Sequence, residues 1–179
     1  MKNSNSKLKI LIKNKDIKKA IKRLAFEISK DYRGKKPLFI GILKGAFIFL
    51  ADLIRELDFD LEIDFIQLSS YGNKKESSGL VQKIIGLKSE IQNRDIIVIE
   101  DIVDTGLTTS FLLEWLEKKE PHSVKLCALT DKPVRREVPI KIDYLGFTIP
   151  DKFIVGFGID FNEQFRNLPH IFYIEGAKI

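Results

Sequence analysis

Ten consecutive positions near the middle of the chain combine carboxylates with hydroxyls. Residues 100–109 read Glu-Asp-Ile-Val-Asp-Thr-Gly-Leu-Thr-Thr, which is three carboxylates and three threonines around one glycine. Threonine hydroxyls and the free N–H groups at the start of a helix can hold a phosphate, and Gly106 lets the backbone approach a ligand closely. Because the run contains no lysine, it does not match the P-loop, and the glycine pattern of dinucleotide-binding folds is missing as well. A phosphate bound here would be held mainly by neutral donors.

The three carboxylates of this run indicate a second kind of chemistry. Glu100 and Asp101 directly follow a predicted strand, where they could accept hydrogen bonds from a sugar diol or orient a hydrated metal ion. Asp104 comes three residues later, beside the phosphate turn, where it could reach a reacting base. An alternative is simple capping, with Asp104 or Thr105 at the start of the helix and the other carboxylates in solvent. The residues alone leave both interpretations open.

The chain around this run alternates between strand and helix patterns. Residues 96–99 are four β-branched residues in a row, typical of a strand buried on both faces. Apolar residues at helical spacing from Asp16 to Ile28 predict a helix that Asp16 could cap. The alternation predicts an α/β fold with a mainly parallel twisted sheet flanked by helices, and ligands at the carboxyl ends of its strands. We predict further strands at 38–43, 61–65, 81–87, 124–129, 142–147, 153–157 and 171–174, helices at 46–57 and 111–119, and a polar loop at 69–79.

Length and composition predict one domain over residues 1–179, with a net charge of +5. The single cysteine, Cys127, excludes an intramolecular disulfide and fits a reducing compartment. The apolar run Ile10–Ile12 is too short for a signal peptide or a membrane span, so we expect neither. Lysines gather in the first 36 residues, which we interpret as a solvated helix face. No arginine-rich run with interleaved aromatics is present, so we expect no nucleic-acid partner.

The segment from Val98 to Gly106 resembles the phosphoribosyl-diphosphate-binding signature of the phosphoribosyltransferases. The similarity is close from Ile97 to Thr109, extends through almost the whole chain, and points to the bacterial-type hypoxanthine-guanine branch. It implies the type I phosphoribosyltransferase fold, with a small hood region formed from the chain termini. It also implies a cytoplasmic, Mg²⁺-dependent purine salvage enzyme. The expected reaction converts hypoxanthine or guanine and 5-phospho-α-D-ribose 1-diphosphate (phosphoribosyl diphosphate) to IMP or GMP and diphosphate.

The resemblance assigns roles residue by residue. Asp104 corresponds to the general base that takes a proton from the purine near N7. Ser70 and Tyr71 correspond to the functional pair of a lid that closes over the active site. The residues expected to bind phosphoribosyl diphosphate are Lys44, Gly45, Ser70, Tyr71, Glu100, Asp101, Thr105, Gly106, Thr108, Thr109 and Arg166. Those expected at the base are Lys132, Lys152, Phe153 and Ile154, and those at the metal are Glu100, Asp101 and Asp160.

For several of these residues the resemblance also implies a particular contact with the substrates. Lys132 would donate a hydrogen bond to the 6-oxo group of the purine. This favours oxo bases, because the N–H donors of a 6-amino group would face the ammonium group, which is itself only a donor. Phe153 would stack on the base, and Ile154 would contact its edge through the backbone. The turn at Lys44 would hold diphosphate through backbone amides, with a cis peptide bond before the lysine. The sequence departs from the family pattern at Lys74-Lys75-Glu76 and at Gly86, so the dynamics of the lid could differ.

Other readings of the sequence stay open. The base could be xanthine, adenine or a pyrimidine, or the protein could be a regulator that binds nucleotide and nucleic acid without turnover. Family resemblance suggests a homodimer or homotetramer. The sequence does not fix the order of preference among hypoxanthine, guanine and xanthine. It also assigns no role to Cys127, His122 or His170.

Overall fold

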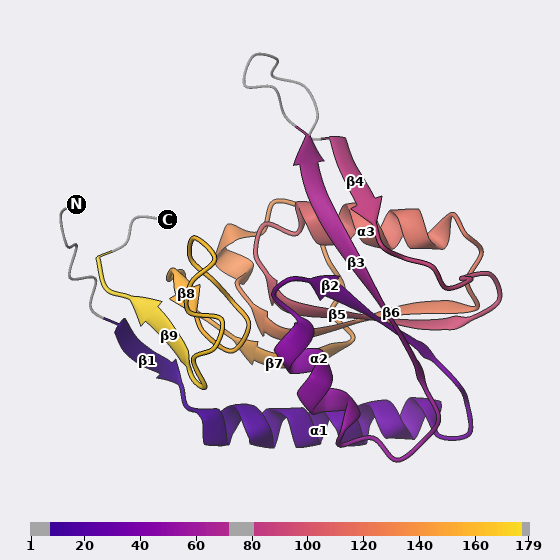
Figure 1. The fold of residues 1–179 in the computed structure, drawn as a ribbon, viewed down its shortest axis with the longest axis horizontal. Helices are drawn as coiled ribbons and strands as arrows, with labels where there is room; N and C mark the ends of the chain where they lie inside the picture. Colours follow the sequence, from indigo (N-terminus) through magenta and orange to yellow (C-terminus); the bar gives the residue numbers. More distant parts are fainter. Residues whose placement is uncertain (1–7, 72–80, 177–179) are drawn as a thin grey trace.

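The computed structural model describes residues 8–71 and 81–176 and contains one main sheet of six strands (Figure 1). The strand order is β4-β3-β2-β5-β6-β7, and every neighbouring pair is parallel except β3 and β4. The strands span β2 (Leu38–Leu43), β3 (Glu62–Tyr71), β4 (Val81–Ile85), β5 (Asp95–Val103), β6 (Ser123–Asp131) and β7 (Tyr144–Thr148). The expected mainly parallel sheet is therefore confirmed.

Helices cover both faces of this sheet, as the sequence predicts. Helices α1 (Asn14–Tyr32) and α2 (Phe47–Ile54) pack on one face, with Phe39, Ile97 and Cys127 in the same apolar cluster. Helix α3 (Leu107–Glu117) packs on the other face, over Ile40 and Val98. Because successive side chains of a strand point to opposite faces, these clusters form two separate layers of core around β5, in which Ile96–Asp101 and Val103 are buried.

A second, three-stranded antiparallel sheet stands beside the main one (Figure 1). It consists of β1 (Leu8–Ile12), β9 (Ile171–Ile174) and β8 (Ile154–Val155), in that order. The first and last described strands thus pair with each other, which confirms the small hood region formed from the ends of the chain. Among the residues that the structure describes, no helix is long and apolar enough to cross a membrane.

Several predicted boundaries were wrong, each for a local reason. Asp16 does not cap α1, because the helix begins at Asn14 and the amide of Asp16 already donates to the carbonyl of Lys13 (2.9 Å). Asp16 instead lies in the first turn, where a carboxylate is favourable near the positive end of the helix dipole. Helix α3 begins four residues earlier than predicted, directly after Gly106. Helix α2 ends at Ile54 and not at 57.

The polar segment predicted as a loop from residue 69 is partly strand. Ser69, Ser70 and Tyr71 continue β3, and their backbones pair with β4 in an antiparallel ladder. The sequence predicted a loop here because these residues are mostly polar. The hydrogen bonds between the strands, however, join backbone groups and do not require apolar side chains. The remainder of that segment, including Lys74-Lys75-Glu76, lies outside the described residues. Strand β1 was not predicted, and β8 is shorter than the expected 153–157.

Candidate active site

The residues assigned from the sequence gather at the carboxyl ends of β2, β5 and β6, next to the hood. A pocket of about 270 Å³ opens at the end of β5. It is lined by Ile42, Leu43, Leu68, Glu100, Ile102, Asp104, Thr105, Gly106, Thr108 and Thr109. Three of these residues, Asp104, Thr105 and Gly106, form the turn between β5 and α3, and Thr108 and Thr109 lie in the first turn of α3. The strand end and the helix start therefore form one wall, as expected for a ligand site in a parallel sheet.

The turn between β5 and α3 is built around Gly106. This residue has φ +88° and occupies the N-cap position of α3, where its carbonyl accepts from the amide of Ser110 (2.8 Å). A left-handed conformation at this point favours glycine, because it has no Cβ. Neither Asp104 nor Thr105 takes the N-cap position, although the hydroxyl of Thr105 accepts from the amide of Leu107 at the start of α3 (3.4 Å). The Asp104 side chain is engaged elsewhere, with charged groups of the segment after β6.

Asp104 lies between two cationic side chains. Its Oδ2 atom is 3.5 Å from Nη1 of Arg135 and 3.7 Å from Nζ of Lys132. Lys132 is almost completely buried, at 3% exposure, which is rare for a lysine without a compensating charge. The other carboxylate oxygen, Oδ1, is buried and has no hydrogen-bond partner among the described residues. A buried acceptor without a partner costs free energy, and such groups are uncommon outside functional sites.

Glu100 and Asp101 form a pair of buried carboxylates at the end of β5. Their exposures are 7% and 8%. Burial raises the pKa of Glu100 well above its usual value, and the neighbouring Asp101 carboxylate adds to the effect. Burial also raises the pKa of Asp101. Burial thus disfavours the charged forms of these two adjacent acids, and a nearby cation or a set of hydroxyl donors would stabilise those forms.

Gly45 brings the turn after β2 against Asp101. A Cβ atom built on Gly45 would lie 2.0 Å from Oδ2 of Asp101. This distance is too short for two non-bonded atoms, so only glycine fits at this position without a shift. The peptide bond just before this turn, between Leu43 and Lys44, is cis. The backbone of Gly158 is equally close, since a Cβ there would lie 2.1 Å from the carbonyl oxygen of Gly45. Two backbone segments and one carboxylate thus meet at this point.

A chain of ion pairs extends from this turn into the segment after β8. Nζ of Lys44 lies 3.0 Å from Oε2 of Glu163, and the same oxygen is 3.3 Å from Nη2 of Arg166. That guanidinium nitrogen also lies 2.7 Å from Oδ1 of Asp160. Hydrogen bonding to Lys44, and then to Arg166, lowers the pKa of Glu163. The two predicted diphosphate-binding cations and the predicted metal-binding Asp160 therefore form one connected cluster.

The residues predicted to contact the base lie at the junction of the hood and the main sheet. Phe153 is half-buried and packs edge-on against Phe161, with ring centroids 5.2 Å apart. Ile154 is buried in β8. Lys152 lies over the ring of Tyr173, with Nζ 4.0 Å from the centroid. Ser70 and Tyr71 lie at the end of β3, and the rest of the predicted lid is outside the described residues.

A sequence model of the phosphoribosyl transferase domain matches residues 8–162. A Bacillus subtilis protein named hypoxanthine-guanine phosphoribosyltransferase is 46% identical over 169 residues, which cover 94% of both chains. An Aquifex aeolicus protein of the same name is 44% identical over 94% of this chain and 96% of its own. A crystal structure of a hypoxanthine-guanine phosphoribosyltransferase from Bacillus anthracis matches with a TM-score of 0.84 and 44% identity, over 94% of this chain and 99% of that chain.

The chain belongs to the hypoxanthine-guanine phosphoribosyltransferase family. This confirms the resemblance, the fold and the enzyme class expected from the sequence. A member of this family is a transferase that forms a bond to the ribose of phosphoribosyl diphosphate. In this phosphoribosyltransferase the signature segment, residues 97–109, forms the end of β5, the turn and the start of α3.

Sequence reasoning missed three charged residues that lie close to the predicted ones. Arg135 and Arg136 follow β6 and reach Asp104, and Glu163 connects Lys44 with Arg166. The pair of arginines three and four positions after Lys132 was a possible signal. Glu163 had none, because its neighbour Lys44 is 119 positions away in the sequence.

The site offers only part of the coordination shell of a magnesium ion. Mg²⁺ takes oxygen ligands and is usually held by one or two carboxylates together with waters and substrate phosphates. Among residues 8–71 and 81–176, no group of three or more histidine, cysteine, aspartate or glutamate side chains could hold a metal by themselves. The buried Glu100 and Asp101 pair has carboxylates whose raised pKa values reflect charge that a cation would compensate. The donors present therefore fit a magnesium ion that arrives with the substrate.

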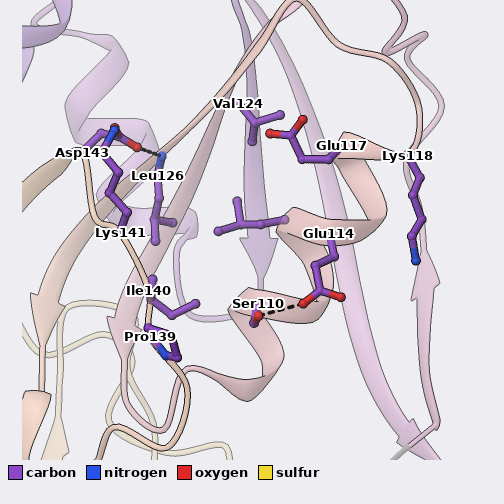
Figure 2. Close-up of a pocket in the computed structure, with 11 residues that line it drawn as sticks. Ser110, Glu114, Glu117, Lys118, Val124, Leu126, Pro139, Ile140, Lys141 and Asp143 are labelled. Carbon is purple, nitrogen blue, oxygen red and sulfur yellow. Dashed lines mark hydrogen bonds and ion pairs between the residues drawn. The ribbon is translucent and has the colours of Figure 1, made fainter.

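A larger pocket of about 570 Å³ shares no lining residue with the first one (Figure 2). It is formed by α3, β6 and the segment before β7, with Leu126 and Ile140 among its apolar lining. Several of its polar groups are engaged with each other: Ser110 donates to Glu114 (3.1 Å), and the amide of Leu126 donates to Asp143 (3.0 Å). Size alone therefore does not mark the active site; the smaller pocket holds the signature residues.

Proposed function

We propose that this phosphoribosyltransferase transfers the 5-phosphoribosyl group to hypoxanthine or guanine and releases diphosphate, with Mg²⁺. The observation that carries the proposal is the position of Asp104. Its buried oxygen Oδ1 has no partner among the described residues, and its other oxygen lies 3.7 Å from the buried ammonium of Lys132. An acceptor and a donor side by side match a purine that offers a proton at N7 and an oxygen at C6. The curated relatives carry the name of this activity.

The 5′-phosphate binds at the turn between β5 and α3. Gly106 and the first turn of α3 lie at this place, where the positive end of the helix dipole favours an anion. Thr105, Thr108 and Thr109 add hydroxyl donors from the pocket lining. The phosphate is held mainly by neutral donors, which leaves the positive side chains for the diphosphate.

The ribose lies over Glu100 and Asp101. Their carboxylates accept hydrogen bonds from the two ribose hydroxyls, and their negative charge favours a sugar that becomes positive as the diphosphate departs. The backbone amides at Lys44 and Gly45, together with the Arg166 guanidinium, bind the departing diphosphate. When bound, the magnesium ion compensates the charge of that diphosphate, and Glu100, Asp101 and Asp160 hold it.

The base lies between Lys132 and the hood. Nζ of Lys132 donates to the 6-oxo group, Phe153 stacks on the ring, Ile154 contacts its edge through backbone groups, and Lys152 stands beside them. Asp104 takes the proton that the purine loses as its nitrogen bonds to C1 of the ribose, a role worth about 10²–10⁴ in rate. Ser70 and Tyr71 begin a lid that excludes water from the cationic sugar.

Steady-state kinetics with radiolabelled hypoxanthine, guanine and xanthine tests this proposal. We expect turnover of hypoxanthine and guanine with phosphoribosyl diphosphate and Mg²⁺, and loss of turnover after exhaustive chelation that added Mg²⁺ restores. Full activity after chelation would contradict the metal requirement. Xanthine as the best substrate would overturn the assigned base, and binding without turnover would favour a regulator.

Location and assembly complete the proposal. A cytoplasmic enzyme fits the single buried thiol of Cys127, which has no partner for a disulfide. We also expect a homodimer or homotetramer with no nucleic-acid or membrane partner. Sedimentation at several protein concentrations measures the assembly.

A further inference from the structure

The side chain of Arg136 connects the two loops that carry Asp104 and Lys132. Strands β5 and β6 are parallel neighbours, and their last residues, Val103 and Asp131, pair in register. The chain then continues from β6 through Lys132 and a short 3-10 helix, Pro133–Arg135, to Arg136. This places Arg136 beside the β5 loop although it lies 32 positions after Asp104.

The guanidinium of Arg136 engages three groups at once. Nε donates to the carbonyl oxygen of Asp104 (3.1 Å), and Nη2 donates to the carbonyl oxygen of Val103 (3.4 Å). Nη2 also pairs with the carboxylate of Asp131. The side chains of Arg136 and Asp131 are only 16% and 14% exposed, so the interaction is largely shielded from water. A planar guanidinium holds such a set of acceptors in a fixed arrangement, which a lysine ammonium cannot do.

Backbone contacts between the same loops strengthen this connection. The amide of Lys132 donates to the carbonyl of Val103, and the amide of Glu137 donates to the carbonyl of Thr105, both at 2.9 Å. The Cδ atom of Arg136 also lies 3.0 Å from the place that a Cβ on Gly106 would occupy. Three consecutive carbonyls, those of Val103, Asp104 and Thr105, therefore accept from the segment after β6. The position of the Asp104 turn depends on that segment.

We propose that Arg136 is a positioning residue that holds the backbone of Asp104 at the distance from Lys132 that proton transfer from the purine needs. This inference rests on the proposed roles of Asp104 and Lys132 and extends them. The hydrogen bonds of the Arg136 guanidinium go to the backbone carbonyls of Val103 and Asp104 and to the Asp131 carboxylate, so we assign it an action through Asp104. Its partner Asp131 stands next to Lys132 in the chain, so one guanidinium links the proton acceptor to the residue that recognises the base.

The test is a double-mutant cycle between Arg136 and Asp104. Arg136→Lys keeps the positive charge but loses the planar guanidinium that donates to several acceptors at once. We expect kcat to fall about 10- to 100-fold, which is the effect of a small misplacement of a catalytic group. The KM for phosphoribosyl diphosphate should change less than about twofold, since the phosphate cradle is kept. In an Asp104→Asn background the same Arg136→Lys change should cost less than about threefold, because there is no longer a base to position.

Matched variants separate this role from a general loss of stability. Arg33 forms a surface ion pair with Asp58 (2.6 Å), and Arg33→Lys should leave kcat unchanged. If Arg136→Lys does not fold, Asp131→Asn removes one of its partners and should lower kcat in the same direction, with the same dependence on Asp104. Thermal melts report the fraction folded in each case.

The outcomes distinguish this inference from the proposed function. An equal loss of kcat from Arg136→Lys in both backgrounds, or no loss in either, would overturn the positioning role alone. Wild-type turnover by a folded Asp104→Asn variant would instead overturn the assignment of Asp104, on which the inference depends. If Arg136→Lys lowers kcat strongly in the wild-type background and only slightly in the Asp104→Asn background, the result supports both the positioning role of Arg136 and the role of Asp104 as the base.

Discussion

The Nζ atom of Lys132 lies 3.7 Å from Oδ2 of Asp104, and the lysine is 97% shielded from solvent while the carboxylate is about one-third exposed. Opposite charges at this distance stabilise each other more strongly in a shielded place than in water. A purine that entered the site would find a donor and an acceptor already paired, and would only have to insert its own acceptor and donor between them. This relationship is the basis of the first two predictions.

Lys132→Gln should weaken the use of 6-oxopurines while leaving phosphoribosyl diphosphate binding nearly unchanged. The variant keeps one possible donor but loses a hydrogen bond from a charged group, so kcat/KM for hypoxanthine should fall about 10- to 100-fold. Competition assays with hypoxanthine and guanine measure the change. Lys36→Gln, a change in an exposed lysine paired with Glu62, is the control and should have no effect. Unchanged kcat/KM in the Lys132 variant would remove the assigned contact.

Asp104→Asn should separate catalysis from binding. The change keeps the size of the side chain but removes the base, so kcat and kcat/KM should fall together by about 10²–10⁴. The affinity for phosphoribosyl diphosphate should stay close to that of the wild type, and Glu100→Gln should affect that affinity more. Stopped assays and calorimetric titration measure the two quantities. A folded variant with normal kcat would leave Asp104 only a structural role.

Much of the site could be predicted from the sequence because its residues are contiguous. Residues 97–109 carry a buried strand, a glycine turn and a helix start in one segment, so their geometry follows from local patterns. The hood was anticipated only through the resemblance, because its strands β1 and β9 are separated by almost the whole chain. The roles of Arg136 and Glu163 were not predicted, for the same reason. Their significance comes from partners 32 and 119 positions away, which no local pattern reveals.

Gly45→Ala should impair turnover far more than it impairs stability. A Cβ at this position would lie 2.0 Å from Oδ2 of Asp101, so the carboxylate or the turn must move. Displacement of a substrate-binding group by about 1 Å can cost about 10²-fold in rate. Gly34→Ala is the matched control: Gly34 has φ +83° and open space around it, so alanine there should lower the melting temperature but spare activity. Equal activity of both variants would show that the close contact between Gly45 and Asp101 is not needed for turnover.

Asp31→Asn should make stability less dependent on pH in acid. Hydrogen bonds from Lys125 and Tyr144 lower the pKa of Asp31, and they join α1 to β6 and β7. Because the folded-state pKa is below the unfolded one of about 4, this stabilisation is present above that pH and is lost as the pH falls. The difference in melting temperature between wild type and variant should therefore shrink from pH 6 to pH 3. The exposed Asp60→Asn variant serves as the control, and a difference that stays constant over this range would contradict the prediction.

Glu163→Gln should tighten the binding of phosphoribosyl diphosphate. In the structure the Glu163 carboxylate lies 3.0 Å from Lys44 and 3.3 Å from Arg166, two positions at which we expect the diphosphate to bind. A substrate anion must displace that carboxylate, and a neutral amide would compete less for the Arg166 guanidinium. Because Glu163 is exposed, the KM for phosphoribosyl diphosphate should fall only modestly, about two- to fivefold, and the effect should weaken in high salt. Glu27→Gln removes a carboxylate from another surface pair, with Arg23, and should leave the KM unchanged. An increase in KM for the Glu163 variant would show instead that this carboxylate holds Lys44 and Arg166 in place for the substrate.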